Sequence, residues 1–227
     1  MPLSGEGSAQ LRGRLVRRYK RFLAEVLFDD GSTVTAHCPN PGAMTGCAVP
    51  GTEVLLSRSD DPRRRLAHTW ELARAGRTWV CINTAVANRV VGGWLKTGRL
   101  FPGEGAVRAE VPVGRSRFDF LLGDRTLVEV KSVTLKVGGF GAFPDSVTAR
   151  GRRHVEELAA LREYRRILLY FVARGDVAEV RSAEEVDPGY AAAVRAARRA
   201  GVEVCAVGAR FAPGRPVACR GWLRVKL

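Results

Sequence analysis

The sequence predicts a mixed α/β protein, of the α+β kind, with a small N-terminal β-barrel and a larger C-terminal core built on a mixed sheet. Two observations lead to this prediction. Up to residue 82, short β-like runs are separated by glycine and proline clusters, which is typical of a small barrel. From residue 83, β-like runs alternate with helical spacing in the order αβββαβαβ, which favours helices packed on a sheet. We therefore expect two domains, 1–82 and 83–227.

The predicted barrel strands are short and closely spaced. An Asp-Asp-Gly turn at 29–31 marks a hairpin between two of them. Five or six strands in this length suit an OB-like fold, a barrel that binds nucleic acids. The predicted strands span residues 11–17, 20–28, 32–37, 52–57, 67–73 and 78–82.

A basic run with interleaved aromatic residues joins the first two predicted strands. It consists of Arg17, Arg18, Tyr19, Lys20, Arg21 and Phe22. Cations can neutralise phosphates, and aromatic rings can stack on bases. We expect the four basic side chains to bind nucleic acid, whereas alternation along a strand would send Phe22 into the core.

The loop from His37 to Gly46 reads HCPNPGAMTG. Pro39 and Pro41 stiffen it, and Gly42 suits a position of positive φ. Such a loop either presents backbone amides to a ligand or simply connects two barrel strands, and the second role is the more common.

The second domain begins with a predicted helix. Asn83 can cap its first turn, and Val86, Val90 and Leu95 recur at a spacing that buries one helical face. A pair of glycines weakens the second half of this helix.

Three β-like runs joined by two tight turns follow, and each carries one acid at an interior position. Turn length fixes which residues face each other in a hairpin. A two-residue turn at 114–115 sets Glu110 opposite Asp119, and a three-residue loop at 123–125 sets Asp119 opposite Glu129. The three carboxylates then form a row across the sheet.

Lys131 lies two residues beyond Glu129 and therefore points to the same face of its strand. Val128 and Val130 make the opposite face apolar, which is typical of a central strand. Like charges directly opposite each other are destabilising, so a cation should lie among the acids. Hard oxygen ligands favour Mg²⁺ or Mn²⁺. The simpler alternative is a solvated face on which Glu129 and Lys131 pair with neighbours.

Three more residues are predicted to lie near these acids. By the same register Arg117 falls opposite Lys131, where it suits gripping a phosphate, although pairing with a carboxylate on its own strand is the alternative. A helix predicted over 143–161 carries Arg150 and His154 one turn apart. We expect both to contact the substrate, and an ordinary buried, hydrogen-bonded histidine is the alternative for His154.

The remaining elements are a buried strand, a helix and a further strand. The apolar run within 165–174 predicts the first strand. Asp187 is the expected N-cap of the helix, and Gly201 follows its end. The last strand is predicted at 202–207, and the tail from Ala212 is expected to be irregular.

The composition restricts the partners. Thirty-seven Lys and Arg face 23 Asp and Glu, a net charge of +14, which indicates a polyanion such as DNA or another nucleic acid. We expect no membrane association and a cytoplasmic location, because there is no long apolar span and the N-terminus, MPLSGEGSAQ, lacks the apolar core of a signal peptide. Five cysteines without a C-x-x-C pair fit a reduced compartment. The sequence is also compatible with a homodimer.

The order of elements, with Asp119 in the second strand of the core and Glu129-x-Lys131 in the third, resembles the αβββαβ core of the PD-(D/E)XK nuclease superfamily. One departure is plain. Phe118 precedes Asp119, so the proline of the superfamily motif is absent, and Pro144-Asp145 comes after the E-x-K and cannot supply it.

A closer resemblance covers nearly the whole chain. Five segments are similar to the sugar fermentation stimulation protein A family of bacteria and archaea: RRYKRFLAEV, HCPNPGAMTG, SRFDFLL, VEVKSVTL and FPDSVTARGRRH. The resemblance implies an OB-like domain joined to a nuclease-like domain. It also implies DNA binding and a proposed connection with the regulation of sugar use.

Carried over to this sequence, the resemblance implies that Asp119 and Glu129 bind metal, with Glu110 as a third ligand, and that Lys131 is the catalytic lysine. It favours a nuclease, a Mg²⁺- or Mn²⁺-dependent phosphodiesterase that acts on DNA. The alternative is a non-catalytic, largely sequence-nonspecific DNA-binding regulator of sugar fermentation genes, since no helix-turn-helix or zinc-finger signature is visible. Direct action on a sugar ranks last, because the +14 charge suits phosphate better.

Overall fold

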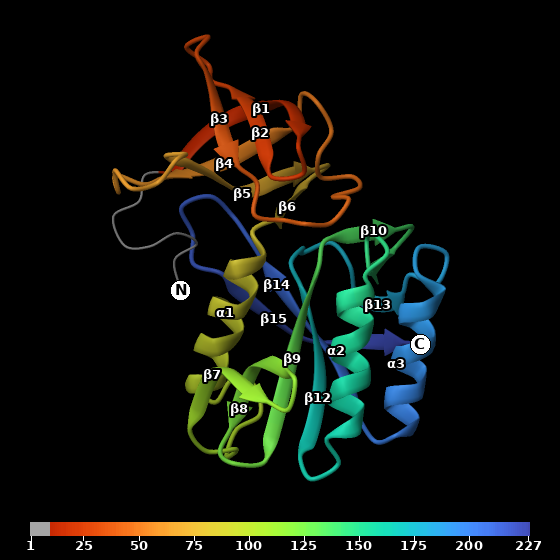
Figure 1. Ribbon diagram of the computed structural model, residues 1–227. Coiled ribbons are helices and arrows are strands. Elements are labelled where there is room, and N and C mark those ends of the chain that lie inside the picture. The colour runs from red at the N-terminus through yellow and green to blue at the C-terminus, as the bar shows by residue number, and fades with distance from the viewer. Residues whose placement is uncertain (1–9) are drawn as a thin grey trace.

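The computed structural model describes residues 10–227, and two sheets organise this part of the chain (Figure 1). Residues 1–9, on which the expectation of no signal peptide depends, lie outside the described range. The first sheet has the order β3-β2-β1-β4-β5-β6, and a parallel pairing of β3 with β5 closes it into a barrel, as predicted. Its strands are β1 (Gln10–Tyr19), β2 (Leu23–Leu27), β3 (Thr33–His37), β4 (Glu53–Arg58), β5 (His68–Ala75) and β6 (Thr78–Cys81).

The basic run covers the end of β1 and the turn between β1 and β2. Lys20 and Arg21 adopt φ values of 46° and 61°, in the left-handed region that few non-glycine residues occupy. The strand expected from residue 20 therefore begins only at Leu23. Phe22 is 44% exposed, so its predicted burial is wrong, because the turn interrupts the alternation on which that prediction relied.

The second sheet is mixed and has the order β10-β11-β13-β15-β14-β12-β9-β8-β7. The central strand β12 runs parallel to both β9 and β14, while β7, β8 and β9 form an antiparallel meander. The mixed α/β fold class is thereby confirmed. The elements are α1 (Thr84–Lys96), β7 (Val107–Val113), β8 (Ser116–Leu122), β9 (Thr126–Val133), β10 (Leu135–Val137), β11 (Phe140–Phe143), α2 (Ala149–Ala160), β12 (Arg165–Val172), β13 (Glu179–Ser182), α3 (Pro188–Arg199), β14 (Glu203–Arg210) and β15 (Ala218–Lys226).

Two sequence predictions for this domain are corrected. The helix expected from residue 143 begins at Ala149, because Phe143 precedes a proline and so stays extended, and Thr148 caps the helix by accepting the Gly151 N–H. The tail expected to be irregular contains β15, which lies between β14 and β13. The predicted caps Asn83 and Asp187 are confirmed.

Helices cover both faces of the second sheet, α1 on one side and α2 with α3 on the other (Figure 1). The side chains of β12 alternate between the two cores that result. Those in the core with α1 are Ile167, Leu169 and Phe171. Those in the core with α2 and α3 are Leu168, Tyr170 and Val172. No helix in residues 10–227 is long and apolar enough to cross a membrane.

Backbone hydrogen bonds connect the barrel to the second sheet. The N–H of Cys81, at the end of β6, donates to the carbonyl of Ala173 at 2.9 Å. Trp79 forms an isolated β-bridge with Phe211, and both side chains lie in the core that includes α1. The two sheets are therefore packed together rather than joined only by the chain.

The loop between β3 and β4 is held from two sides. From β1, the Arg18 guanidinium donates to the carbonyls of Asn40 at 2.8 Å and Gly42 at 2.9 Å. The N–H of Met44 donates to Oδ2 of Asp145, from the segment between β11 and α2, at 3.0 Å. A Cβ atom on Gly42 would lie 2.2 Å from Oδ1 of Asp145. Only glycine allows this loop to approach the segment between β11 and α2 so closely.

We expect Gly42→Ala to lower the free energy of unfolding by about 1–3 kcal/mol, the usual cost of overpacking a close contact. Urea denaturation measures the change. Gly139→Ala is the matched control, because a Cβ at Gly139 meets no atom within 4 Å. In the double variant Gly42→Ala, Asp145→Ala the cost of the alanine at 42 should shrink, since the clashing carboxylate is gone. Equal stabilities of Gly42→Ala and the unsubstituted chain would contradict this packing.

Candidate metal centre

Strands β8 and β9 separate at Asp119. Their pairing starts after the predicted loop at 123–125 in the predicted register and ends with Phe120 opposite Val128. Beyond that point Oδ2 of Asp119 accepts the backbone N–H of Val130 at 2.7 Å. A side chain thus takes the place of the next backbone contact, and the expected direct pairing of Asp119 with Glu129 does not form.

Asp119 also interrupts the pleat of β8. Phe118 packs in the core with α2 and α3, whereas Phe120 packs in the core with α1. Residues two apart share a face in a regular strand, so the strand is irregular between them. From α1, Nδ2 of Asn88 donates to Oδ1 of Asp119 at 2.6 Å. Both carboxylate oxygens are therefore fixed in position.

Glu129 lies on the face of β9 opposite Val128 and Val130, as the alternation predicted, and this face turns toward α2. Its Oε1 accepts a hydrogen bond from Nζ of Lys131 at 2.6 Å and from Nδ1 of His154 at 2.8 Å. The residue is only 3% exposed, and Oε2 is buried without a hydrogen-bond partner. Burial alone would raise the pKa of Glu129, but the bonds from His154 and Lys131 lower it below its ordinary value. Glu129 is therefore a charged carboxylate in which one oxygen, Oε2, has no hydrogen-bond partner.

Asp119 has the opposite tendency. Burial, followed by the negative charge of Glu129, raises the pKa of Asp119 to about 6. The Val130 N–H, the Lys131 charge and the Asn88 amide oppose this rise without cancelling it. The free protein therefore keeps a proton on Asp119 more readily than an ordinary aspartate does.

Glu110 and Arg117 differ from the prediction in detail. The flanking pairs of β7 and β8 keep the expected register, but Glu110 itself has φ 55° and its side chain is 60% exposed. Its Oε2 lies 3.7 Å from Nη1 of Arg117. Arg117 is not opposite Lys131, since β8 and β9 have already separated there, and its ion-pair partner is Glu110 rather than Asp119.

A cavity of about 740 Å³ opens over this group of side chains. Seven of the predicted site residues line it: Glu110, Arg117, Asp119, Glu129, Lys131, Arg150 and His154. The structure therefore brings together residues that the sequence spreads from β7 to α2.

The four basic residues of the barrel lie apart from this cavity. Arg17 pairs with Glu25, with Nε 2.6 Å from Oε2. Arg18 is occupied by the backbone carbonyls of the loop between β3 and β4. Lys20 is exposed in the turn, and Arg21 lines a second cavity together with Lys131. Arg21 is thus the member of the basic run that lies nearest to the chemistry of the site.

Comparison with known proteins agrees with this architecture. The model of the "Sugar fermentation stimulation protein RE domain" matches residues 85–215, and the "SfsA N-terminal OB domain" matches residues 16–82. The chain belongs to the sugar fermentation stimulation protein family. RE denotes a restriction-endonuclease-like domain. The barrel of this family member is accordingly OB-like, as predicted.

Individual relatives of the family cover most of the chain. A sugar fermentation stimulation protein homolog of Geobacter sulfurreducens is 48% identical over 208 residues, 88% of this chain and 90% of the relative. A homolog of Thioalkalivibrio sulfidiphilus is 49% identical over 210 residues, 88% and 89% of the two chains. The solved structure of Pyrococcus furiosus SfsA in complex with Ca²⁺ has a TM-score of 0.90 at 24% identity and covers 100% of both chains.

The sequence prediction missed residues that contact the acids or line the cavity over them. Asn88 had no clear signal, because it is one polar residue on a helix whose neighbours Ala87 and Val86 are buried. Asn88 bonds Asp119 without lining the cavity over the acids, whereas Arg115 and Arg153, which were missed as well, do line it. Their charge was visible in the sequence, but only the folded chain shows that the first turn of the meander and the N-terminal half of α2 meet at the same place.

The oxygens of the site fit a hard divalent cation. Glu129 contributes a buried oxygen without a hydrogen-bond partner, and Asp119 stands close enough for the two charges to interact. Carboxylate oxygens suit Mg²⁺ or Mn²⁺. Within residues 10–227 no group of three or more His, Cys, Asp or Glu side chains is arranged to enclose an ion. A cation at Asp119 and Glu129 would therefore keep much of its water, as Mg²⁺ commonly does.

The carboxyl of Asp119 should titrate with a midpoint near pH 6 in the metal-free protein, because burial and Glu129 raise the pKa to about 6. Carboxyl-detected NMR measures this midpoint. Glu129→Gln removes the neighbouring negative charge and should lower the midpoint. Asp30 is an internal control that titrates below its ordinary value, since Ser32 donates to it. A midpoint near 4 for Asp119 would show that the site is open to water.

Proposed function

We propose that this chain is a divalent-metal-dependent phosphodiesterase that acts on DNA, with Asp119 and Glu129 as metal ligands. The observation that carries the proposal is the unpartnered, buried Oε2 of Glu129. A buried charged oxygen is costly unless a cation or donor reaches it. The Pyrococcus furiosus relative was solved in complex with Ca²⁺, a cation that takes oxygen ligands as Mg²⁺ does. We take Mg²⁺ or Mn²⁺ as the working ion.

The surrounding side chains suit phosphodiester hydrolysis. A bound divalent cation supplies an activated water and polarises the phosphodiester. Lys131, with a side chain that is 12% exposed beside Glu129, can orient the attacking water or stabilise charge on the phosphorus oxygens. Arg117 and Arg150 line the same cavity and can grip a phosphate. His154 acts on Glu129, whose Oε1 it holds.

The cations of the cavity favour a polyanionic substrate. Arg115 and Arg153 add to Arg117, Arg150 and Lys131 along its wall. With a net charge of +14, binding should be driven mainly by phosphate contacts and should weaken steeply as salt rises. DNA meets this requirement better than an uncharged sugar does.

A non-catalytic DNA-binding regulator is the second candidate. One observation favours it: within the described residues no three acidic, histidine or cysteine side chains enclose an ion. In that case the nuclease-like core would serve as a scaffold, and DNA binding would persist without turnover. Cleavage assays separate the two candidates.

With Mn²⁺ or Mg²⁺, the pure chain should cleave labelled single- or double-stranded DNA, and EDTA should abolish the cleavage. Asp119→Asn and Lys131→Met should each lower the rate at least about 100-fold, since the first weakens a metal ligand and the second removes a group placed to stabilise the reacting phosphate. Arg198→Ala, on the exposed end of α3, is the control and should cleave normally. Cleavage that survives both site substitutions would point to a contaminating nuclease. DNA binding without any cleavage would favour the non-catalytic regulator.

Mn²⁺ binding should depend on both carboxylates. Calorimetry should show weaker binding to Glu129→Gln, while Glu156→Gln, exposed on α2, binds as the unsubstituted chain does. Since the pKa of Asp119 is raised to about 6, a proton competes with the metal below that pH, and affinity should fall about tenfold between pH 7.5 and pH 5. Affinity that is constant over this range would exclude Asp119 as a ligand.

A further inference from the structure

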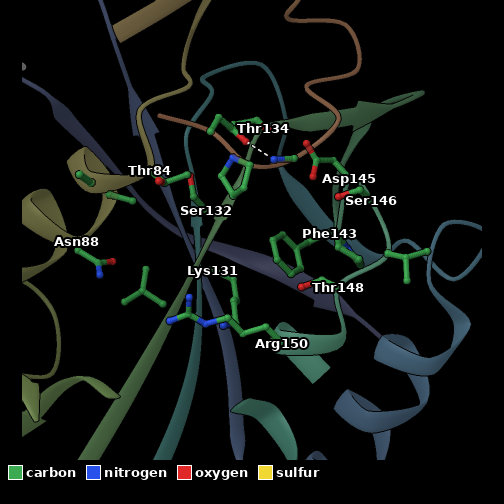
Figure 2. A pocket seen from close by; sticks show the side chains of 18 of the residues that line it. Thr84, Asn88, Lys131, Ser132, Thr134, Phe143, Asp145, Ser146, Thr148 and Arg150 are labelled. Carbon is green, nitrogen blue, oxygen red and sulfur yellow. Dashed lines mark hydrogen bonds between the residues drawn. The ribbon is translucent and has the colours of Figure 1, made fainter. Parts of the chain in front are cut away.

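A second cavity adjoins the metal centre. It has a volume of about 850 Å³ and lies between the barrel and the second sheet (Figure 2). The two cavities share six lining residues: Glu110, Val130, Lys131, Phe143, Thr148 and Arg150. A molecule bound at Asp119 and Glu129 can therefore continue past Lys131 into the second cavity.

The walls of this second cavity come from three parts of the chain. Figure 2 shows Thr84 and Asn88 of α1 on one side, Asp145 and Thr148 on the other, and Lys131 between the two sides. The barrel supplies the remaining wall through Arg21 and the loop at residues 40–42. The cavity is therefore a joint product of the barrel and the nuclease-like domain.

The barrel loop is attached on both sides of this cavity. On the α1 side, Oγ1 of Thr84 donates to the carbonyl of Pro39 at 3.0 Å. On the other side, the N–H of Met44 donates to Asp145 at 3.0 Å, and the close approach at Gly42 leaves no gap there. The loop thus bridges the two walls and forms one edge of the cavity.

The volume of the second cavity and the residues that line it indicate which kind of molecule it can hold. A volume of about 850 Å³ lies within the ~300–1,000 Å³ of cavities that enclose a small ligand, which is room for one or two nucleotides but not for a double helix. Arg21, Lys131 and Arg150 place cations along the path. Phe143 lines the path with a half-buried aromatic side chain, the kind of group on which bases commonly stack.

We infer that this passage takes the nucleotides next to the scissile phosphate as a single strand that runs from the metal centre to the OB-like barrel. The inference rests on the proposed function and specifies its substrate. DNA would be cut where it is single-stranded, as in a flap, an overhang or a frayed end, and not inside a continuous duplex. Because the barrel covers this path, it restricts the substrate to DNA that is single-stranded there.

The test uses the full chain and one labelled sequence in three forms, a single strand, a blunt duplex and a duplex with a single-stranded overhang. Fluorescence anisotropy in EDTA measures binding, and Mn²⁺ assays measure cleavage. We expect the single strand and the overhang to bind at least about tenfold more tightly than the blunt duplex, and cleavage to fall in single-stranded nucleotides.

A bulky side chain introduced into the passage provides the decisive variant. Ala85 is exposed on the first turn of α1 and lines the second cavity but not the cavity over the acids. Ala85→Trp should fill the passage and weaken single-strand binding about tenfold. Ala192→Trp, at an exposed position of α3, is the matched control and should leave binding unchanged. Thermal melting confirms that both variants are folded.

The outcomes separate this inference from the proposed function. If Ala85→Trp binds single strands as tightly as the control does, or if a blunt duplex is bound and cut internally as well as a single strand, the passage inference is wrong, even though metal-dependent cleavage stands. If the binding pattern holds but no DNA is cut with any metal, the phosphodiesterase proposal fails and the strand path remains as a binding site.

Discussion

The constraint on which the site depends is a carboxylate buried in the interior of the second sheet. Glu129 lies on β9, where its neighbour on β12 is Leu168, so its surroundings on the sheet are largely apolar. Removing a charge from water is costly unless partners compensate it. Lys131, on the same strand face, and His154, from α2, supply two donors to one oxygen. The position of α2 over the sheet therefore helps to stabilise the negative charge of Glu129.

The start of α2 is itself fixed by a neighbouring helix. Asp187 caps α3 by accepting the Tyr190 N–H at 2.8 Å, and its other oxygen accepts the N–H of Thr148, the N-cap of α2, also at 2.8 Å. One carboxylate thus sets the beginnings of two helices. Because α2 carries Arg150 and His154 into the cavity, the cap of α3 helps to define where a phosphate can bind.

Sequence reasoning succeeded where local rules decide the structure and failed where long-range contacts do. The turn at 123–125 fixed the register down to Phe120 and Val128, because loop length determines pairing. Sequence reasoning did not predict that the Asp119 side chain accepts the Val130 N–H, because this bond forms only where strands β8 and β9 have separated. Strand β15 was missed because none of its residues is buried and three successive exposed residues, 220–222, interrupt its alternation, and its partners β13 and β14 are identifiable only in the assembled sheet.

The arrangement of the acids also depends on the barrel. Glu71, buried on β5, accepts a hydrogen bond from Nδ2 of Asn83 at 2.8 Å, and Asn83 caps α1. Five residues later on that helix, Asn88 holds Asp119. The helix is a rigid element with one end bonded to the barrel and its inner face bonded to the metal centre. A shift of the barrel relative to the second sheet would therefore move Asn88 and loosen Asp119. Since the barrel also contributes the loop at residues 40–42 to the cavity beside Lys131, the geometry of the acids and the shape of the passage are set by one interface.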